Sequence, residues 1–462
     1  MSRSKRFSVL RDPVHGDVYL SHEEIAVLDT PEMQRLRGVR QLGTAYLAYP
    51  GALHTRFDHS IGTLHLTQRL IEAINLNFDL DPRSCLGISE HEERVIRMAA
   101  LLHDVTHIPF GHNIEDQTGL FHRHDSAYRF ERRLSKETEL GRVLDSLGLR
   151  EDVLNTLLGS TNGVPPYWSQ VLSDTICSDI LDYLQRDAYF TGLRLGVDTR
   201  IANYFKIDRK SGNLFIDLAK RELLREDILS EVVRMLEARY YFSERVYYHH
   251  AKVSAGALVA RAVELAVEAD LVQEQEFYDL TDASLLDLLE RRAAQPSEAG
   301  SATDLKPRIR RLVDSFRRRR LFKRACVFPR YANEERQDDL VARFFDRERR
   351  EERCAVEARI ADLARFATGQ EIEIVLYCPA ARMQLKEVET HVRWPGEAEL
   401  LPLSSYADRV PRLGDLERSY RDLWKFYVFA DTTDVAQLRK VQDIATQELA
   451  PARNVYRIED AV

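Results

Sequence analysis

The sequence lacks the features that mark membrane and secreted proteins. None of its apolar runs approaches the roughly 20 residues that a membrane-spanning helix needs. The basic residues at its start are not followed by the apolar core of a secretory signal. Its five cysteines lie far apart and form no CxxC pair, so we expect neither a disulfide framework nor a zinc-thiolate site. These absences favour a cytoplasmic protein without a membrane partner.

An excess of basic residues is also absent. The formal net charge is −8, which argues against a protein that coats nucleic acid without regard to sequence. Hydrophobic residues make up 44% of the chain and charged residues 30%, as in ordinary globular proteins. At roughly 100–200 residues per domain, the 462 residues suffice for two or three lobes.

Helical patterns dominate the first 270 residues, where few strand patterns occur. This predicts an α-helical core. A short extended stretch is expected at 8–20, and Pro31 after Thr30 is typical of a helix start. Helices are expected at about 23–41, 59–76, 91–104, 124–136, 143–158, 168–187, 217–245 and 249–270.

The remainder of the chain changes character. Small polar residues at 293–304 indicate a linker, and a strongly basic run follows at 306–324. Strand patterns at 371–378, 391–395 and 423–431 precede a helical pattern at 433–449. We therefore predict a mainly α fold with a helical core (1–270), a helical extension with the linker and the basic run (271–335), and a smaller C-terminal α+β lobe (336–462).

Histidine is unevenly distributed, since 11 of the 14 histidines lie at or before position 124. Histidine is the commonest metal ligand and acid–base residue, so this crowding suggests a site. An apolar helix at 95–102 runs directly into His103 and Asp104. A carboxylate at a buried helix end is costly unless it is paired or bound to a cation. The simpler alternative is a helix-capping aspartate with incidental histidines.

Two further segments carry candidate ligands. His59 begins an apolar helix, where it is either a ligand or a capping or core histidine. Asp179, Tyr183 and Asp187 are four residues apart and therefore line one helix face. That face either borders the core or is solvated and paired with Arg186.

Together these segments predict a metal centre formed by His59, His103, Asp104 and Asp179. Two imidazoles and two carboxylates suit a divalent ion such as Mg²⁺, Mn²⁺, Fe²⁺ or Zn²⁺ and leave positions for water and a phosphate oxygen. A bound metal lowers the pKa of its water and neutralises phosphate charge, as phosphoester hydrolysis requires. The proton for the leaving oxygen could come from His107, His112 or His124.

The set H…HD…D resembles the HD superfamily. The segments 12–20, 29–43, 49–62, 101–112 and 182–193 resemble, in order, its deoxynucleoside triphosphate (dNTP) triphosphohydrolase branch, which includes the vertebrate enzyme with a SAM domain before its HD domain. The resemblance implies an HD-domain helical core that hydrolyses a dNTP to deoxynucleoside and inorganic triphosphate. It also implies a homo-oligomer, either a dimer or a tetramer.

The resemblance assigns roles residue by residue. It implies that the phosphates are contacted by Arg56, His107, His112 and His124, and that one of these histidines also acts as general acid. Gln41, Tyr183 and Asp187 would surround the deoxyribose, with Tyr183 where a 2′-hydroxyl would lie. Leu42 would also bind the substrate, and Arg239 and Tyr247 would lie near phosphate and sugar or base. A regulatory site for GTP or a dNTP would include Asp29, Gln34, Arg37, Arg319 and Lys323.

Two departures keep other readings open. Ile180 stands where the branch often has a phosphate-binding lysine, and Ser8 stands where the regulatory site would have one. The substrate could instead be a nucleoside monophosphate or diphosphate, an alarmone, a cyclic nucleotide or a nucleic-acid end. The run 306–324 could bind single-stranded nucleic acid, or its charges could pair with acids such as those at 346–357.

Overall fold

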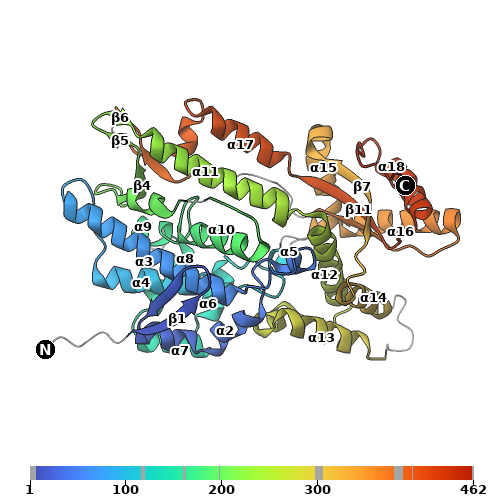
Figure 1. Ribbon diagram of the computed structural model, residues 1–462. Helices are drawn as coiled ribbons and strands as arrows, with labels where there is room; N and C mark the ends of the chain where they lie inside the picture. The colour runs from blue at the N-terminus through green and yellow to red at the C-terminus, as the bar shows by residue number, and fades with distance from the viewer. Residues whose placement is uncertain are drawn as a thin grey trace.

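The computed structural model describes residues 7–115, 120–159, 163–196, 198–296, 305–378, 389–397 and 399–459. Within them the fold is mainly helical, as predicted, and small sheets accompany the helices (Figure 1). The helices of the first half are α1 (His22–Leu28), α2 (Pro31–Gln34), α3 (Arg56–Leu80), α4 (Glu90–Leu102), α5 (His112–Glu115), α6 (Ala127–Arg133), α7 (Glu139–Ser146), α8 (Arg150–Leu158), α9 (Pro166–Gln170) and α10 (Ser178–Thr191). The second half contains α11 (Glu226–Phe242), α12 (His250–Glu268), α13 (Asp282–Ala293), α14 (Lys306–Arg317), α15 (Gln337–Phe344), α16 (Arg350–Thr368), α17 (Pro411–Arg421) and α18 (Val435–Glu448).

The long helix α3 is the centre of the helical core, because it packs on both α4 and α10. Capping boxes start α3 at Thr55 and α4 at Ser89, where each hydroxyl accepts from the amide three residues later. Buried aliphatic side chains then fill the space between these helices, among them Leu64, Ile71 and Leu101. This packing fixes the helix ends that carry the candidate ligands.

Corrections concern four helices that were expected to be continuous. The predicted helix 23–41 is divided into α1, α2 and a 3-10 helix at Arg35–Gly38, and the predicted helix 168–187 is divided into α9 and α10. The predicted helix 217–245 begins only at Glu226, because the preceding residues form the strands β4 (Leu214–Asp217), β5 (Ala219–Lys220) and β6 (Leu223–Leu224). A short, fully buried strand has no alternation, so its pattern resembles that of a buried helix. The predicted helix 143–158 is interrupted at Gly148, whose φ of 68° suits glycine.

The extended N-terminal stretch is an antiparallel hairpin of β1 (Ser8–Asp12) and β2 (Gly16–Leu20). A four-stranded sheet has the order β10-β9-β4-β3, where β3 is Phe205–Ile207, β9 is His391–Arg393 and β10 is Leu401–Pro402. Here β9 runs parallel to β4, and α17 packs on α11 (Figure 1). Part of the C-terminal region thus returns to the helical core, across the predicted boundary at 335.

A second sheet has the order β7-β11-β8 and is antiparallel, with β7 at Lys323–Pro329, β8 at Ile374–Tyr377 and β11 at Lys425–Ala430. Alternate residues of β11 face opposite sides. Tyr427 and Phe429 pack with α12 and α14, whereas Phe426 and Val428 pack with α16 and α18. The predicted strands and C-terminal helix are therefore confirmed. Most of the predicted linker 293–304 lies outside the described residues.

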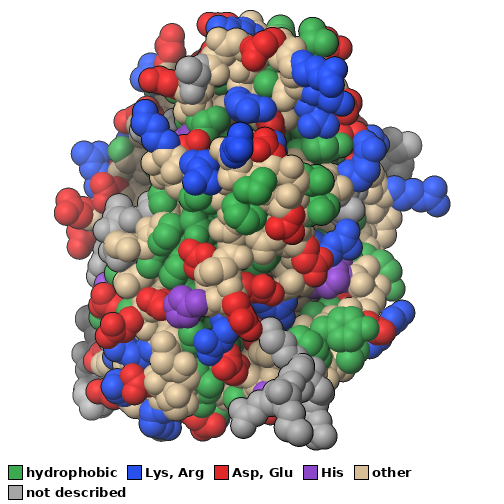
Figure 2. All heavy atoms as spheres, turned by 90° about the vertical axis from the view of Figure 1, so that its left-hand side faces the viewer, with side chains coloured by type: hydrophobic (Ala, Val, Ile, Leu, Met, Phe, Trp, Pro, Cys, Tyr) green, Lys and Arg blue, Asp and Glu red, His purple; other side chains and the backbone are tan. Residues whose placement is uncertain are grey.

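Among the helices described, none combines the length and the apolar character that crossing a bilayer requires. Acidic and basic side chains lie interspersed over the face of the molecule that Figure 2 shows.

Buried ion pairs connect α12 to α16. Arg261 donates to Glu357 at 2.7 Å, and Arg350 and Arg353 donate to Glu264. Burial alone would raise the pKa of Glu264, but the charges of the three arginines outweigh it and lower the pKa to about 2.

We expect a pH-dependent loss of stability in the variant Glu264→Gln. The carboxylate has a lower pKa in the folded chain, so its contribution is complete above pH 4.5 and is lost as the pH falls toward 2. The shift corresponds to a free energy on the order of 3 kcal/mol. Denaturant unfolding should show that the free energy of unfolding of the wild type exceeds that of the variant most near pH 7, and that this difference narrows below pH 4.5.

Glu268→Gln is the matched control, because Glu268 is exposed and also pairs with Arg350. It should cost less than about 1 kcal/mol at any pH. A gap for Glu264→Gln that stays constant down to pH 3 or so would contradict the assigned pKa.

Candidate active site

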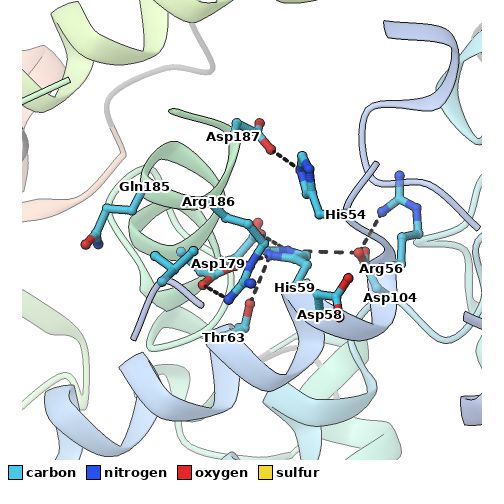
Figure 3. Close-up of polar contacts among 12 residues, drawn as sticks. His54, Arg56, Asp58, His59, Thr63, Asp104, Asp179, Gln185, Arg186 and Asp187 are labelled. Carbon is cyan, nitrogen blue, oxygen red and sulfur yellow. Dashed lines mark hydrogen bonds and ion pairs between the residues drawn. The ribbon is translucent and has the colours of Figure 1, made fainter. Parts of the chain in front are cut away.

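The four predicted metal ligands meet where α3, the end of α4 and α10 come together, and Figure 3 shows three of them, His59, Asp104 and Asp179. His59 Nε2 lies 2.9 Å from Asp179 Oδ1 and 3.1 Å from His103 Nε2. Donor atoms of these three residues all lie within 4.8 Å of one another. Asp104 Oδ1 is 3.6 Å from His103 Nε2, and Asp104 Oδ2 is 3.9 Å from His59 Nε2. A divalent ion fits this donor set of two imidazoles and two carboxylates.

The electrostatics of this group favour a bound cation. Burial raises the pKa of Asp104 and Asp179, but nearby positive charges and hydrogen bonds outweigh it, so both pKa values are lowered and both groups are ionised. Burial lowers the pKa of His59, yet its hydrogen bonds to Asp179 and Asp182 raise it to about 10. A proton and a metal ion therefore compete for the same nitrogen of His59.

A second group contains the histidines 107, 112 and 124, which also lie within 4.8 Å of one another. The rings of His107 and His124 are stacked, with centroids 3.7 Å apart and planes 18° from parallel. Nitrogen lone pairs lie in the ring plane, so stacked rings direct theirs along parallel lines rather than to one point. This arrangement suits contact with several phosphate oxygens better than coordination of one ion.

The surroundings of these histidines differ. Burial and the charge of Arg56 lower the pKa of His107 well below its usual value, so this ring is neutral. His124 Nδ1 lies 2.8 Å from Glu115, and Arg129 donates to the other oxygen of that carboxylate at 2.5 Å. His112 is exposed. Arg56 donates to Asp104 at 2.6 Å (Figure 3), and its charge also acts on His107 of the second group.

Both groups line one cavity of about 570 Å³. The structure brings every predicted substrate contact to its wall: Gln41, Leu42, Arg56, Tyr183, Asp187, Arg239 and Tyr247. Three of these side chains present buried polar atoms that have no hydrogen-bond partner among the described residues, namely Gln41 Oε1, Arg56 Nε and Arg239 Nη1. Such atoms are costly to bury unless a ligand pairs with them.

Asp187 is held from two sides. His54 Nε2 lies 2.8 Å from one carboxylate oxygen, and the Tyr247 hydroxyl donates to the other at 2.7 Å. Tyr247 ends a π-helical turn, Ser243–Tyr247, which follows α11 directly. The sequence prediction missed His54, although it lies two residues before Arg56 within a recognised motif.

Other contributors came from unexpected places. Tyr377 of β8 and Tyr420 of α17 line the cavity, and the Tyr420 hydroxyl is 2.5 Å from Ser243 Oγ. No local sequence pattern indicates these tyrosines, because their place depends on the return of the C-terminal region. Asp182, also unforeseen, lies against His59, and Arg186 pairs with Asp182 rather than with Asp179.

The predicted regulatory residues lie apart from this cavity, and none of them is among the described residues that line it. Arg37 donates to Gln34 at 2.9 Å and covers the ring of Phe57. Arg319 donates to the carbonyl of Leu47 at 2.8 Å. The remaining two members, Asp29 and Lys323, are exposed. Their joint role stays a prediction.

Two family models match the chain. The model of the HD domain matches residues 56–187, and the model of the HD associated region matches residues 217–453. A solved structure of a hypothetical protein from Aquifex aeolicus superposes with a TM-score of 0.64 at 21% identity, covering 96% of this chain and 100% of that one. This likeness concerns the fold alone.

Several curated relatives are named as enzymes. A deoxynucleoside triphosphate triphosphohydrolase SAMHD1 homolog of Dictyostelium discoideum is 28% identical over 345 residues, covering 70% of this chain and 60% of that protein. The SAMHD1 enzyme of Mus musculus is 26% identical over 354 residues (65% and 52%). The uncharacterized protein YwfO of Bacillus subtilis is 31% identical over 265 residues (56% and 55%). The chain spans about half the length of the curated relatives it matches.

Variants in the two histidine groups should differ in how far Mn²⁺ stabilises them against unfolding. Mn²⁺ at about 100 times its dissociation constant should stabilise the wild type by about 2.7 kcal/mol. His103→Ala should lose this stabilisation, because it removes a predicted ligand. His124→Ala should keep it, because its ring belongs to the stacked group. Thermal unfolding with and without Mn²⁺ measures both, and equal losses in the two variants would contradict the assignment.

Proposed function

The chain belongs to the family of proteins with an HD associated region, here following an HD domain, and we propose that it is a metal-dependent dNTP triphosphohydrolase. The products would be the deoxynucleoside and inorganic triphosphate. One observation carries the proposal: a two-histidine, two-carboxylate group and a three-histidine group share one cavity with Arg56. The names of the relatives support the choice of substrate.

The chain's own residues would divide the work of hydrolysis. When bound, a divalent ion would lower the pKa of its water and neutralise phosphate charge. Arg56 offers a planar guanidinium to phosphate oxygens. Because His107 is neutral, the proton for the departing 5′-oxygen falls to His112 or His124.

The sugar would occupy the part of the cavity near α10. The ring of Tyr183 lies 6.5 Å from that of His59, beside the metal group. Burial raises the pKa of Tyr183, so its hydroxyl stays neutral. An aromatic ring at this place would exclude a 2′-hydroxyl by steric contact. Asp187, already fixed by His54 and Tyr247, would accept from the sugar.

Ile180 bears on how the triphosphate of the substrate would be bound, because it stands where the branch often has a phosphate-binding lysine. Ile180 is 4% exposed and packs in the core, so no cation occupies the position of the missing lysine. The cavity nevertheless has a basic lining that could hold a polyphosphate: Arg40, Arg56, Arg123, Arg239 and Lys252. The alternative, another nucleotide or phosphoester, is favoured only by Ile180.

Binding of single-stranded nucleic acid by the basic run 306–324 has less support. Arg308 and Arg311 donate to Glu373 at 2.5 and 3.0 Å, and Arg318 donates to Asp314 at 2.6 Å. These charges are used within the fold, although not by the acids at 346–357 that the sequence suggested. A homo-oligomer, a GTP or dNTP activator and a cytoplasmic location are further parts of the proposal.

Product analysis tests the reaction directly. Incubation with each dNTP and Mn²⁺, followed by anion-exchange separation, should give deoxynucleoside and triphosphate. Asp104→Ala should reduce kcat/KM at least 10³-fold or so, because it removes a ligand and the partner of Arg56. A panel with ribonucleotides, monophosphates and cyclic nucleotides runs in parallel. A monophosphate or cyclic nucleotide as the best substrate would favour the alternative.

Selectivity for the sugar should depend on Tyr183. Tyr183→Ala should lower the ratio of kcat/KM for dNTP over the matching ribonucleotide by about tenfold, equivalent to about 1.4 kcal/mol. Tyr189→Ala is the matched control, because Tyr189 lies on the same helix and is exposed. An unchanged ratio in Tyr183→Ala would show that another group excludes the hydroxyl.

A further inference from the structure

A chain of buried polar side chains leads from His59 away from the cavity. The two nitrogens of the His59 ring face opposite ways: Nε2 faces Asp179 and His103, whereas Nδ1 lies 2.7 Å from Asp182 Oδ2. Asp182 is fully buried and does not line the cavity. Asp182 therefore contacts one predicted metal ligand, His59, but is not itself a predicted ligand.

Asp182 is itself clamped. Arg186 donates to both of its oxygens, from Nε at 2.8 Å and from Nη2 at 2.9 Å, and Figure 3 shows Arg186 beside His59. His15 Nε2 lies 2.6 Å from Asp182 Oδ1. The third nitrogen of Arg186, Nη1, donates to Asp12 Oδ2 at 2.8 Å. All polar positions of the Asp182 carboxylate thus have donors.

The chain of contacts ends in the N-terminal hairpin. Asp12 closes β1, and its Oδ1 accepts from the amides of Val14 and His15 at 2.9 and 2.7 Å. These bonds hold the turn that carries His15. The ring of His15 also stacks on that of His65 of α3, with centroids 5.2 Å apart. The turn is therefore fixed against the same helix that carries His59.

Gly62 on α3 shows how closely the helices approach here. A Cβ atom at this position would lie 1.9 Å from Asp182 Oδ1 and 2.2 Å from Arg186 Nη2. Glycine inside a helix costs roughly 0.5–1 kcal/mol relative to alanine. The carboxylate–guanidinium pair thus occupies space that any side chain at 62 would need.

We propose that Asp182 is a positioning residue for the metal centre and that Arg186, His15 and Asp12 hold it in place. Asp182 accepts from Nδ1–H of His59, which fixes the tautomer and the ring so that the Nε2 lone pair faces the ion. The N-terminal hairpin is then a functional part of the metal centre. The proposal rests on the metal role of His59 within the proposed function, but not on the identity of the substrate.

Metal affinity tests this role without any substrate. Asparagine at 182 would supply one acceptor oxygen where aspartate supplies two, and its NH₂ group would face donors. Asp182→Asn should therefore weaken Mn²⁺ binding by about 10–100-fold, measured by titration calorimetry. Wild-type affinity in this variant would overturn the proposal.

Glu24→Gln is the matched control for a merely structural effect. Glu24 is buried in the same core and pairs with Arg97 through two bonds of 2.8 and 2.9 Å, but it does not contact a predicted ligand. Both variants should lower the unfolding temperature, and only Asp182→Asn should lose Mn²⁺ affinity. Equal losses of affinity would assign Asp182 a structural role and overturn the proposal.

Variants of His15 test whether the hairpin takes part. His15→Leu removes the contact to Asp182 and should weaken Mn²⁺ binding several-fold, while His15→Gln keeps a donor and should restore most of it. Equal affinity in His15→Leu and wild type would remove the hairpin from the proposal. The outcomes for Asp182 and for the substrate can be told apart. If the variants of Asp182 and His15 behave as expected but no dNTP is hydrolysed, the proposed substrate is wrong and the positioning role of Asp182 stands. If the wild type binds no Mn²⁺, the positioning role of Asp182 is overturned.

Discussion

The compensation of buried carboxylates around His59 is the constraint on which the rest of the site depends. Asp104 follows α4, whereas Asp179 and Asp182 both lie on α10, and all three approach this ring; Asp104 and Asp182 are buried, and the side chain of Asp179 is 32% exposed. Buried charges are tolerated only where partners balance them. Arg56 balances Asp104 and Arg186 balances Asp182, whereas the contacts of Asp179 are to the two imidazoles. The crossing of α3 and α10 is thus built around a place for positive charge.

The C-terminal region completes the cavity that surrounds this centre. Strand β9 extends the sheet of β4, and α17 covers α11, which brings Tyr420 to the wall. Strand β8 of the second sheet contributes Tyr377 to the lining of the same cavity. Ion pairs between Arg261 and Glu357 hold α16 against α12. The HD associated region is therefore more than an appended lobe, because the cavity has no complete wall without it.

The two histidine groups show why residue identity alone does not define a role. Both contain imidazoles within 4.8 Å of one another. In one group the nitrogens of His59 and His103 converge beside carboxylates. In the other, the rings of His107 and His124 stack and their lone pairs run side by side. Ring orientation, which tertiary packing sets, is therefore what distinguishes the proposed metal centre from the proposed surface for phosphate.

The sequence by itself determined the helical core, the C-terminal strands and the residues that gather in the cavity. It could do so because helical spacing and the order of the HD motifs are local patterns. Only the tertiary structure decided that Asp182 faces His59, that Tyr377 and Tyr420 reach the cavity, and that residues 214–224 form strands. Each of these depends on contacts between segments far apart in the chain. Burial and pairing in three dimensions, which no local spacing encodes, fixed them.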